Sequence, residues 1–229
     1  MVTGEDKIRI LLSEPEIKDQ LQKTILFFDD IKRNNLRIRH PNIQFDCFIR
    51  GYIGEYAIKK WLSENKIIAD TTIRLMQNNI DIDLLYKYKN IEIKASLVPD
   101  NDIFIENAIM WRDIKIIKRT ENINDLAADI YLQLYFQQKS KAKDMWLKQQ
   151  SIDISCKDIN YLYNSFRLDL YKDNLYFVAW MDKETLKTNI NKLPDEQKVW
   201  TFGERQFWKC RIKNSNKPID LIHYLNKIK

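Results

Sequence analysis

The residues best suited to chemistry lie on two consecutive predicted strands, where carboxylates and one lysine alternate with apolar side chains. In the strand over residues 90–96, Glu92 and Lys94 point to the same side. In the segment before it, Asp81 and Asp83 also share one face. If the apolar faces pack on a common core, the charged side chains gather on the opposite face. Mg²⁺ binds one or two carboxylates together with water and phosphate oxygens, and a lysine beside it can act on the attacking water.

The loop between the two strands decides whether these side chains meet. A four-residue loop over residues 87–90 places Asp83 opposite Lys94 and diagonal to Glu92, within reach of a shared ion. A two-residue turn at the end of this loop separates Asp83 from Glu92 by roughly 13 Å, at about 3.3 Å per residue. The loop contains neither Asn-Gly nor Asp-Gly, which are typical of tight hairpins. We therefore predict the longer loop.

A further carboxylate, Glu55, lies in a helix predicted over residues 44–65. A phenylalanine of the apolar stripe stands seven residues before it, and seven residues turn a helix by about 700°, within ~20° of the starting direction. Glu55 therefore lies on the buried stripe, where it needs a partner such as a metal-bound water or Lys94. Gly51 and Gly54 in the same helix would let another backbone or a substrate come close.

These residues resemble the catalytic motif of the PD-(D/E)XK nuclease superfamily. The resemblance rests on Glu55 in a G-x-x-G-E helix, on Asp83, and on the E-x-K element Glu92-Ile93-Lys94 of the next strand. It implies a Mg²⁺ ion bound by Asp83, Glu92 and the Ile93 carbonyl. It also implies that Lys94 acts on the attacking water and that Glu55 supports the site.

The resemblance covers residues 45–97, and over the rest of the chain it rests only on the order of the predicted elements. The sequence departs from the family pattern in one place, because no proline precedes Asp83. Asp81, two residues earlier, is a second candidate for the metal aspartate. We favour Asp83 because the apolar Leu84 and Leu85 after it match the family's usual run.

The predicted elements favour an α/β fold, at the border with α+β, in which helices flank a mixed β-sheet. A 3.6-residue apolar repeat predicts a helix over residues 14–33, before the helix that carries Glu55. Strands are predicted at residues 72–76, 80–88, 90–97, 128–136, 175–181 and 207–212, and helices at 141–150 and 184–193. This order is typical of a layered fold and agrees with the restriction-endonuclease-like fold that the resemblance implies.

The chain of 229 residues contains no internal repeat or linker-like stretch, which predicts a single nuclease domain. Within it we expect an N-terminal helical part over residues 1–44 and a catalytic core over 45–136. Residues 137–229 are then expected to complete the sheet and recognise DNA. Four glycines and five prolines exclude collagen-like and low-complexity chains.

The excess of positive charge in this chain, which has a net charge of +6, is concentrated in three basic islands. Residues 32–39 hold four basic and no acidic residues, residues 111–119 hold four basic and one acidic, and the segment from Lys209 holds six basic and one acidic. Together they could form a groove that neutralises phosphates. The first two islands supply the candidate DNA-binding residues: Lys32, Arg33, Arg37, Arg39, Arg112, Lys115, Lys118 and Arg119.

The spacing of the cysteines and the length of the apolar runs indicate the cellular compartment. Cys47, Cys156 and Cys210 are far apart and form no CxxC pair, so neither a disulfide framework nor a zinc site is indicated. A reduced, cytoplasmic setting is the simplest interpretation. Because no apolar run approaches the ~20 residues of a span and the N-terminus lacks an apolar signal region, we expect neither a membrane segment nor a secretory signal.

Two other kinds of chemistry are disfavoured. His40 and His223 are the only histidines, which argues against a histidine-dependent metal site or a Ser-His-Asp triad. Neither a phosphate-binding P-loop nor a G-x-G-x-x-G motif is present, so we expect no nucleotide cofactor.

These features predict a Mg²⁺-dependent endonuclease that hydrolyses phosphodiester bonds of double-stranded DNA. We expect a sequence-specific type II restriction enzyme that acts as a homodimer. A Holliday-junction resolvase or a phage recombination or repair nuclease is the nearest alternative, although resolvases are usually smaller. A nuclease-like DNA-binding protein without cleavage is the alternative outside the enzymes, and the intact set of Asp83, Glu92 and Lys94 argues against it.

Overall fold

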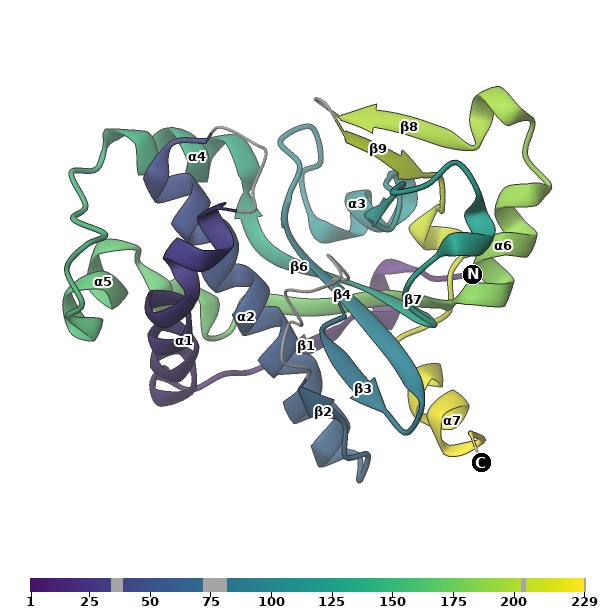
Figure 1. Cartoon of the computed structure of the whole chain (residues 1–229), viewed down its shortest axis with the longest axis horizontal. Coiled ribbons are helices and arrows are strands. Elements are labelled where there is room, and N and C mark those ends of the chain that lie inside the picture. Colours follow the sequence, from purple (N-terminus) through teal and green to yellow (C-terminus); the bar gives the residue numbers. More distant parts are fainter. Residues whose placement is uncertain (34–38, 72–81, 203–204, 229) are drawn as a thin grey trace.

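A computed structural model of the chain describes residues 1–33, 39–71, 82–202 and 205–228. Within these residues the main element is a mixed sheet with the strand order β1-β7-β6-β4-β3-β2 (Figure 1). Its strands are β1 Ile8–Ile10, β2 Asp70–Thr71, β3 Leu84–Tyr86, β4 Lys89–Val98, β6 Ile130–Lys139 and β7 Leu175–Asp182. β4 and β6 run parallel, and the other neighbours are antiparallel. Helices pack on this sheet, so the predicted α/β fold is confirmed.

One face of the sheet packs on helices from both ends of the chain. The strict alternation predicted for β4 directs Ile91 and Ile93 into this core, where both are buried. The two longest helices, α1 and α2, contribute Ile17, Leu21 and Ile49 to it. The helices that supply residues to this core are α1 Glu14–Arg33, α2 Pro41–Glu64, α4 Ser140–Gln149, α5 Ile159–Ser165 and α7 Asp220–Asn226.

The other face of the sheet packs on a second, smaller core. Tyr131 and Tyr135 of β6 and Met181 of β7 are buried there. The elements above them are α3 Ile105–Trp111, α6 Lys183–Asn191 and a small sheet of β5 Ile116–Ile117, β8 Val199–Phe202 and β9 Arg205–Trp208. β4 and β6 therefore lie between two apolar layers. Within the described ranges, no helix is both long and apolar enough to cross a membrane.

Most of the predicted helices and strands are confirmed, among them the helices predicted at 141–150 and 184–193, which are α4 and α6. The helices and strands expected at 14–33, 44–65, 90–97, 128–136 and 175–181 are present as α1, α2, β4, β6 and β7. The strand predicted at 72–76 and the first residues of the one at 80–88 lie outside the described residues. The sequence pattern did not predict β1, β2, β5, β8, α3, α5 or α7, because each is too short to show a repeat.

The hairpin loop between β3 and β4 is shorter than predicted. Tyr86 pairs with Lys89, so the turn contains only two residues. Lys87 supplies the positive φ of 52° that this turn needs, without a glycine. The predicted register, with Asp83 opposite Lys94, is therefore wrong by two residues.

Glu16 ties α1 to α2 and so helps to place the helix that carries Glu55. It closes the first turn of α1 by accepting a hydrogen bond of 2.7 Å from the Ser13 main chain. From α2, the Tyr56 hydroxyl donates to its carboxylate at 2.8 Å and Lys60 Nζ lies at 2.9 Å. Burial alone would raise the pKa of Glu16, but these partners lower it to about 2.

Glu16→Gln is expected to destabilise the protein by about 1–3 kcal/mol at pH 7, since one pKa unit corresponds to about 1.4 kcal/mol. The pKa of the folded state lies below the ordinary value of 4.5. The stabilisation is therefore present above about pH 4.5 and is lost as the pH falls toward 2. Urea unfolding of wild type and variant across this range measures it, with Glu64→Gln at the exposed end of α2 as the control. A difference that persists unchanged at low pH would contradict this account.

Candidate active site

The Asp83 carboxylate lies against the main chain of β4 beside Glu92. Asp83 Oδ2 accepts a hydrogen bond of 2.6 Å from the main-chain nitrogen of Ile93. In a continued antiparallel ladder, a main-chain carbonyl of the segment before β3 would accept this bond. Here the Asp83 carboxylate replaces that carbonyl, at the point where the pairing of β3 ends. Asp83 is buried there, with 5% of its surface exposed. Asp83 therefore contacts the peptide that joins Glu92 to Ile93.

Glu92 and Lys94 form an ion pair on the face of β4 that packs toward the smaller core. Lys94 Nζ lies 2.6 Å from Glu92 Oε1. The glutamate is buried and the lysine is half-buried, so water screens the pair only in part. Glu92 Oε1 has no aligned hydrogen bond in addition to this contact.

The donor atoms at this place suit Mg²⁺. A strand residue directs its N–H and C=O to the same neighbour, so the Ile93 carbonyl faces the same edge of β4 as the Asp83 carboxylate. Two carboxylates and a carbonyl are the hard oxygen ligands that Mg²⁺ takes together with water. In the part of the chain that the structure describes, no three His, Cys, Asp or Glu side chains are grouped closely enough to hold a metal. A Mg²⁺ ion here would therefore need Asp83, Glu92, the Ile93 carbonyl and several waters.

Glu55 approaches this site from the helix on the other face of the sheet. It is buried, with 7% of its surface exposed. The preceding residue, Gly54, packs so closely on β4 that an added Cβ would lie 2.7 Å from the Ala95 Cβ. The close approach predicted for Gly54 is thus confirmed, whereas the one predicted for Gly51 is wrong, because nothing lies within 4 Å of a Cβ added there.

The orientation of α2 turns Glu55 toward the edge of the sheet at which Asp83 lies. Residues four apart share one side of a helix, so Glu55 and Lys59 point the same way. Lys59 Nζ donates to Thr71 Oγ1 of β2 at 3.0 Å. This side of α2 therefore faces β2 at the edge of the sheet.

Gln133 of β6 belongs to the site and was missed from the sequence. It is fully buried opposite Lys94 in the parallel β4–β6 pair. Its Nε2 donates to the Lys94 carbonyl at 3.0 Å, and its Oε1 accepts from the Lys115 main chain at 3.2 Å. A glutamine in the middle of an otherwise apolar strand was the available signal, since buried amides need partners.

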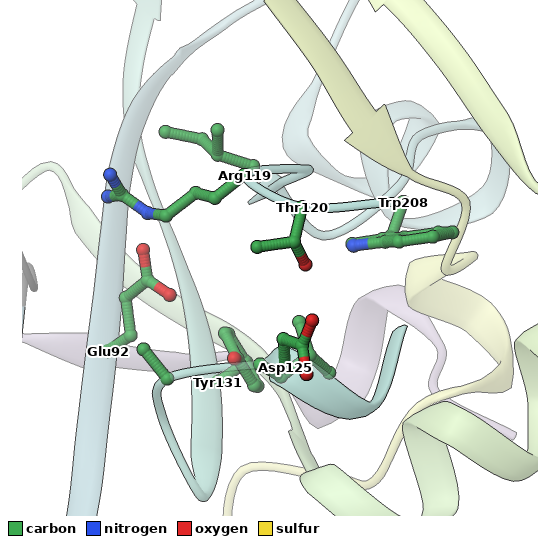
Figure 2. Close-up of a pocket in the computed structure, with 9 residues that line it drawn as sticks. Glu92, Arg119, Thr120, Asp125, Tyr131 and Trp208 are labelled. Carbon is green, nitrogen blue, oxygen red and sulfur yellow. The ribbon is translucent and has the colours of Figure 1, made fainter. Parts of the chain in front are cut away.

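A pocket adjoins Glu92 on the side away from α2. Its lining includes Glu92 and Tyr131 from the main sheet and Trp208 from β9. Figure 2 shows Arg119 extending from the opposite wall toward the Glu92 carboxylate. Burial and the nearby Glu92 raise the pKa of the Tyr131 hydroxyl above its usual range, so it stays protonated. The predicted DNA-binding residue Arg119 thus lies beside the acidic centre.

Two other predicted DNA-binding residues already have acidic partners. Arg112 Nε lies 2.7 Å from Asp102 Oδ2, and this contact together with the charge of Asp102 raises the arginine's pKa. Lys118 Nζ pairs with Glu121 in the same loop. Both positive charges are therefore largely neutralised within the free protein.

The remaining predicted DNA-binding residues include a pair from different islands. Arg37 lies outside the described residues, as do the side chains of Lys32 and Arg33 at the end of α1. Burial and neighbouring arginines, among them Arg39, lower the pKa of Lys115 to about 8. The first two basic islands therefore converge at Arg39 and Lys115.

No protein-family model, curated protein or solved structure matches this chain. Its function is therefore inferred from the chemistry of its own residues.

The packing of α2 on β4 predicts opposite effects for two glycines of one helix. Gly54→Ala places a methyl group 2.7 Å from the Ala95 Cβ and should destabilise the protein by about 1–3 kcal/mol. Gly51→Ala meets nothing within 4 Å and should stabilise it by up to about 1 kcal/mol, because alanine favours a helix over glycine. Urea unfolding of the two variants checks both signs. Equal effects would contradict the close packing at Gly54.

Proposed function

We propose that this protein is a Mg²⁺-dependent DNA endonuclease, most simply a type II restriction enzyme that cleaves double-stranded DNA. The proposal rests on the arrangement of Asp83, Glu92 and Lys94. The Asp83 carboxylate contacts the Glu92–Ile93 peptide at 2.6 Å, and Lys94 Nζ lies 2.6 Å from Glu92. Two buried carboxylates, a carbonyl at a strand edge and an ammonium group are what metal-assisted hydrolysis of a phosphodiester requires.

Each residue has a role that follows from its position. Asp83, Glu92 and the Ile93 carbonyl would hold the metal, which supplies a Lewis acid for the phosphate and lowers the pKa of a bound water. The Lys94 ammonium lies where it can hold the attacking water by a hydrogen bond. It also offsets the negative charge that builds up on the phosphate during attack.

Glu55 and Gln133 act as positioning residues in this proposal. Gln133 holds the Lys94 carbonyl through its amide and so fixes the strand segment that carries the ammonium. Glu55 is buried and follows Gly54, at which α2 packs tightly against Ala95 of β4. Cleavage of both strands calls for two copies of the site, which a symmetric homodimer supplies.

Supercoiled plasmid incubated with Mg²⁺ is expected to yield discrete linear fragments, and EDTA is expected to abolish them. Lys94→Ala should lower the rate by about 10²-fold or more, the usual contribution of a group that handles the proton of the attacking water. Lys94→Arg keeps the charge paired to Glu92 and should also be slow, which separates chemistry from folding. Lys192→Ala on the exposed end of α6 is the matched control.

The same assay contains the outcomes that would contradict the proposal. Cleavage confined to four-way junctions would identify a resolvase instead of a restriction enzyme. Retained DNA binding without any cleavage in Mg²⁺ would show a DNA-binding protein that does not cut.

Glu55→Ala is expected to slow cleavage strongly while the protein stays folded, because Glu55 orients the site from the helix layer. The circular dichroism spectrum and the thermal midpoint monitor folding, and Glu64→Ala on the same helix is the control. Near-normal cleavage by Glu55→Ala would remove this residue from the site.

A further inference from the structure

An unpaired cation lies beside the candidate active site. Lys115 is half-buried in the segment before β5, and its main-chain nitrogen donates to Gln133 Oε1. The other end of the same amide donates to the Lys94 carbonyl. Among the residues that the structure describes, the Lys115 ammonium has neither a hydrogen-bond acceptor nor a carboxylate partner. A cation without a counter-ion among the described residues is available to an anion from outside the protein.

Two arginines, Arg39 just before α2 and Arg50 within it, contact the same sulfur atom. Arg39 Nη1 lies 2.8 Å from Cys47 Sγ, and Arg50 Nη2 lies 3.3 Å from the same sulfur. Both guanidiniums therefore converge on one thiol. Lys115 is close enough to them that, after burial, the charges of Arg50 and Arg39 are among the causes of its lowered pKa. The three cations repel one another in the free protein.

The nearby carboxylates do not neutralise this group. Asp46 is fully buried, and Arg50 Nε at 2.8 Å and the Tyr171 hydroxyl at 2.7 Å occupy its two oxygens. Lys143 Nζ lies a further 3.8 Å from it. The cations around Lys115, Lys143 and Asp144 include Arg39, Arg50, Arg112, Lys148 and Arg167, and the acidic groups include Asp46, Asp169 and the Cys47 thiol. Among these side chains the cations outnumber the carboxylates.

We propose that Arg39 and Lys115, with Arg50 beneath them, bind one backbone phosphate of the DNA strand that is cleaved at the Lys94 site. The identity of the strand rests on the proposed function, whereas the need for an anion rests on the contacts above. A guanidinium and an ammonium on one anion match phosphate oxygens, which accept several charge-assisted hydrogen bonds. The Gln133 amide ties this site to Lys94, so a strand with its scissile phosphate at Lys94 presents a neighbouring phosphate here.

A phosphate ligand explains why a lysine occupies position 115 although neighbouring arginines repel its charge. A pKa lowered to about 8 means that the folded protein disfavours the charged form. Lys115→Met should therefore raise the thermal midpoint of the free protein while it weakens DNA binding. Stability and binding move in opposite directions, as expected for a group placed for its ligand. A midpoint below that of wild type would show that Lys115 stabilises the free fold and would overturn the assignment.

Fluorescence anisotropy of a labelled DNA duplex in EDTA, at several salt concentrations, tests the proposal without cleavage. The slope of log Kd against log salt should fall by about 0.9 in the double variant Arg39→Met/Lys115→Met, because one phosphate contact is lost. Two independent phosphates would give a fall of about 1.8 and would overturn the shared site. Lys115→Arg should keep the slope, and Lys192→Met on α6, at the far end of the molecule from α4 in Figure 1, should leave it unchanged.

Two further results separate this site from the proposed function. Asp144→Asn removes a nearby negative charge and should tighten duplex binding, whereas weaker binding would contradict the site. Inorganic phosphate should raise the thermal midpoint of wild type more than that of Lys115→Met, and equal shifts would overturn the anion site. If the double variant keeps the full slope while plasmid is still cleaved, the phosphate site fails alone. If the slope falls and no plasmid is ever cleaved, the endonuclease fails and the phosphate site stands.

Discussion

The hydrogen bond from the Ile93 main chain to the Asp83 carboxylate sets the geometry on which the candidate site depends. It ends the pairing of β3 with β4 and places one carboxylate beside the peptide of a second, Glu92. With the pairing ended, the Ile93 carbonyl faces the same edge as Asp83. A carboxylate in a ladder position would be costly without this partner, because a buried charge needs hydrogen bonds. The site is thus formed where a regular sheet stops.

β4 lies between two layers, and its alternate side chains face opposite layers. Ile91 and Ile93 pack under α2, while Glu92 and Lys94 project toward the small sheet and α3. The contact of Gly54 with Ala95 sets how close the helix comes and therefore where Glu55 lies. From the other layer, Gln133 joins the strand of Lys94 to the segment of Lys115. One amide therefore joins the proposed catalytic strand to the proposed phosphate-binding segment.

The sequence predicted what local periodicity encodes. The long helices, β4 and the shared face of Glu92 and Lys94 follow from repeats of 3.6 and two residues. The hairpin register was not predicted correctly, because Lys87 adopts a positive φ that is more common for glycine or asparagine. The roles of Gln133 and of the Arg39–Lys115 pair depend on contacts between residues far apart in the chain, which no local pattern records. The roles proposed for Asp83, Glu92 and Lys94 come from the resemblance to the nuclease superfamily and stay predictions.

The central claim is that Asp83 and Glu92 form one divalent-cation site. Isothermal titration of Mn²⁺, as a stand-in for Mg²⁺, into the protein bound to duplex DNA tests it most directly. We predict a binding site in wild type that is lost in Asp83→Asn and in Glu92→Gln and is kept in Asp81→Asn. Unchanged Mn²⁺ binding in Asp83→Asn and Glu92→Gln, or its absence from wild type, would contradict the account.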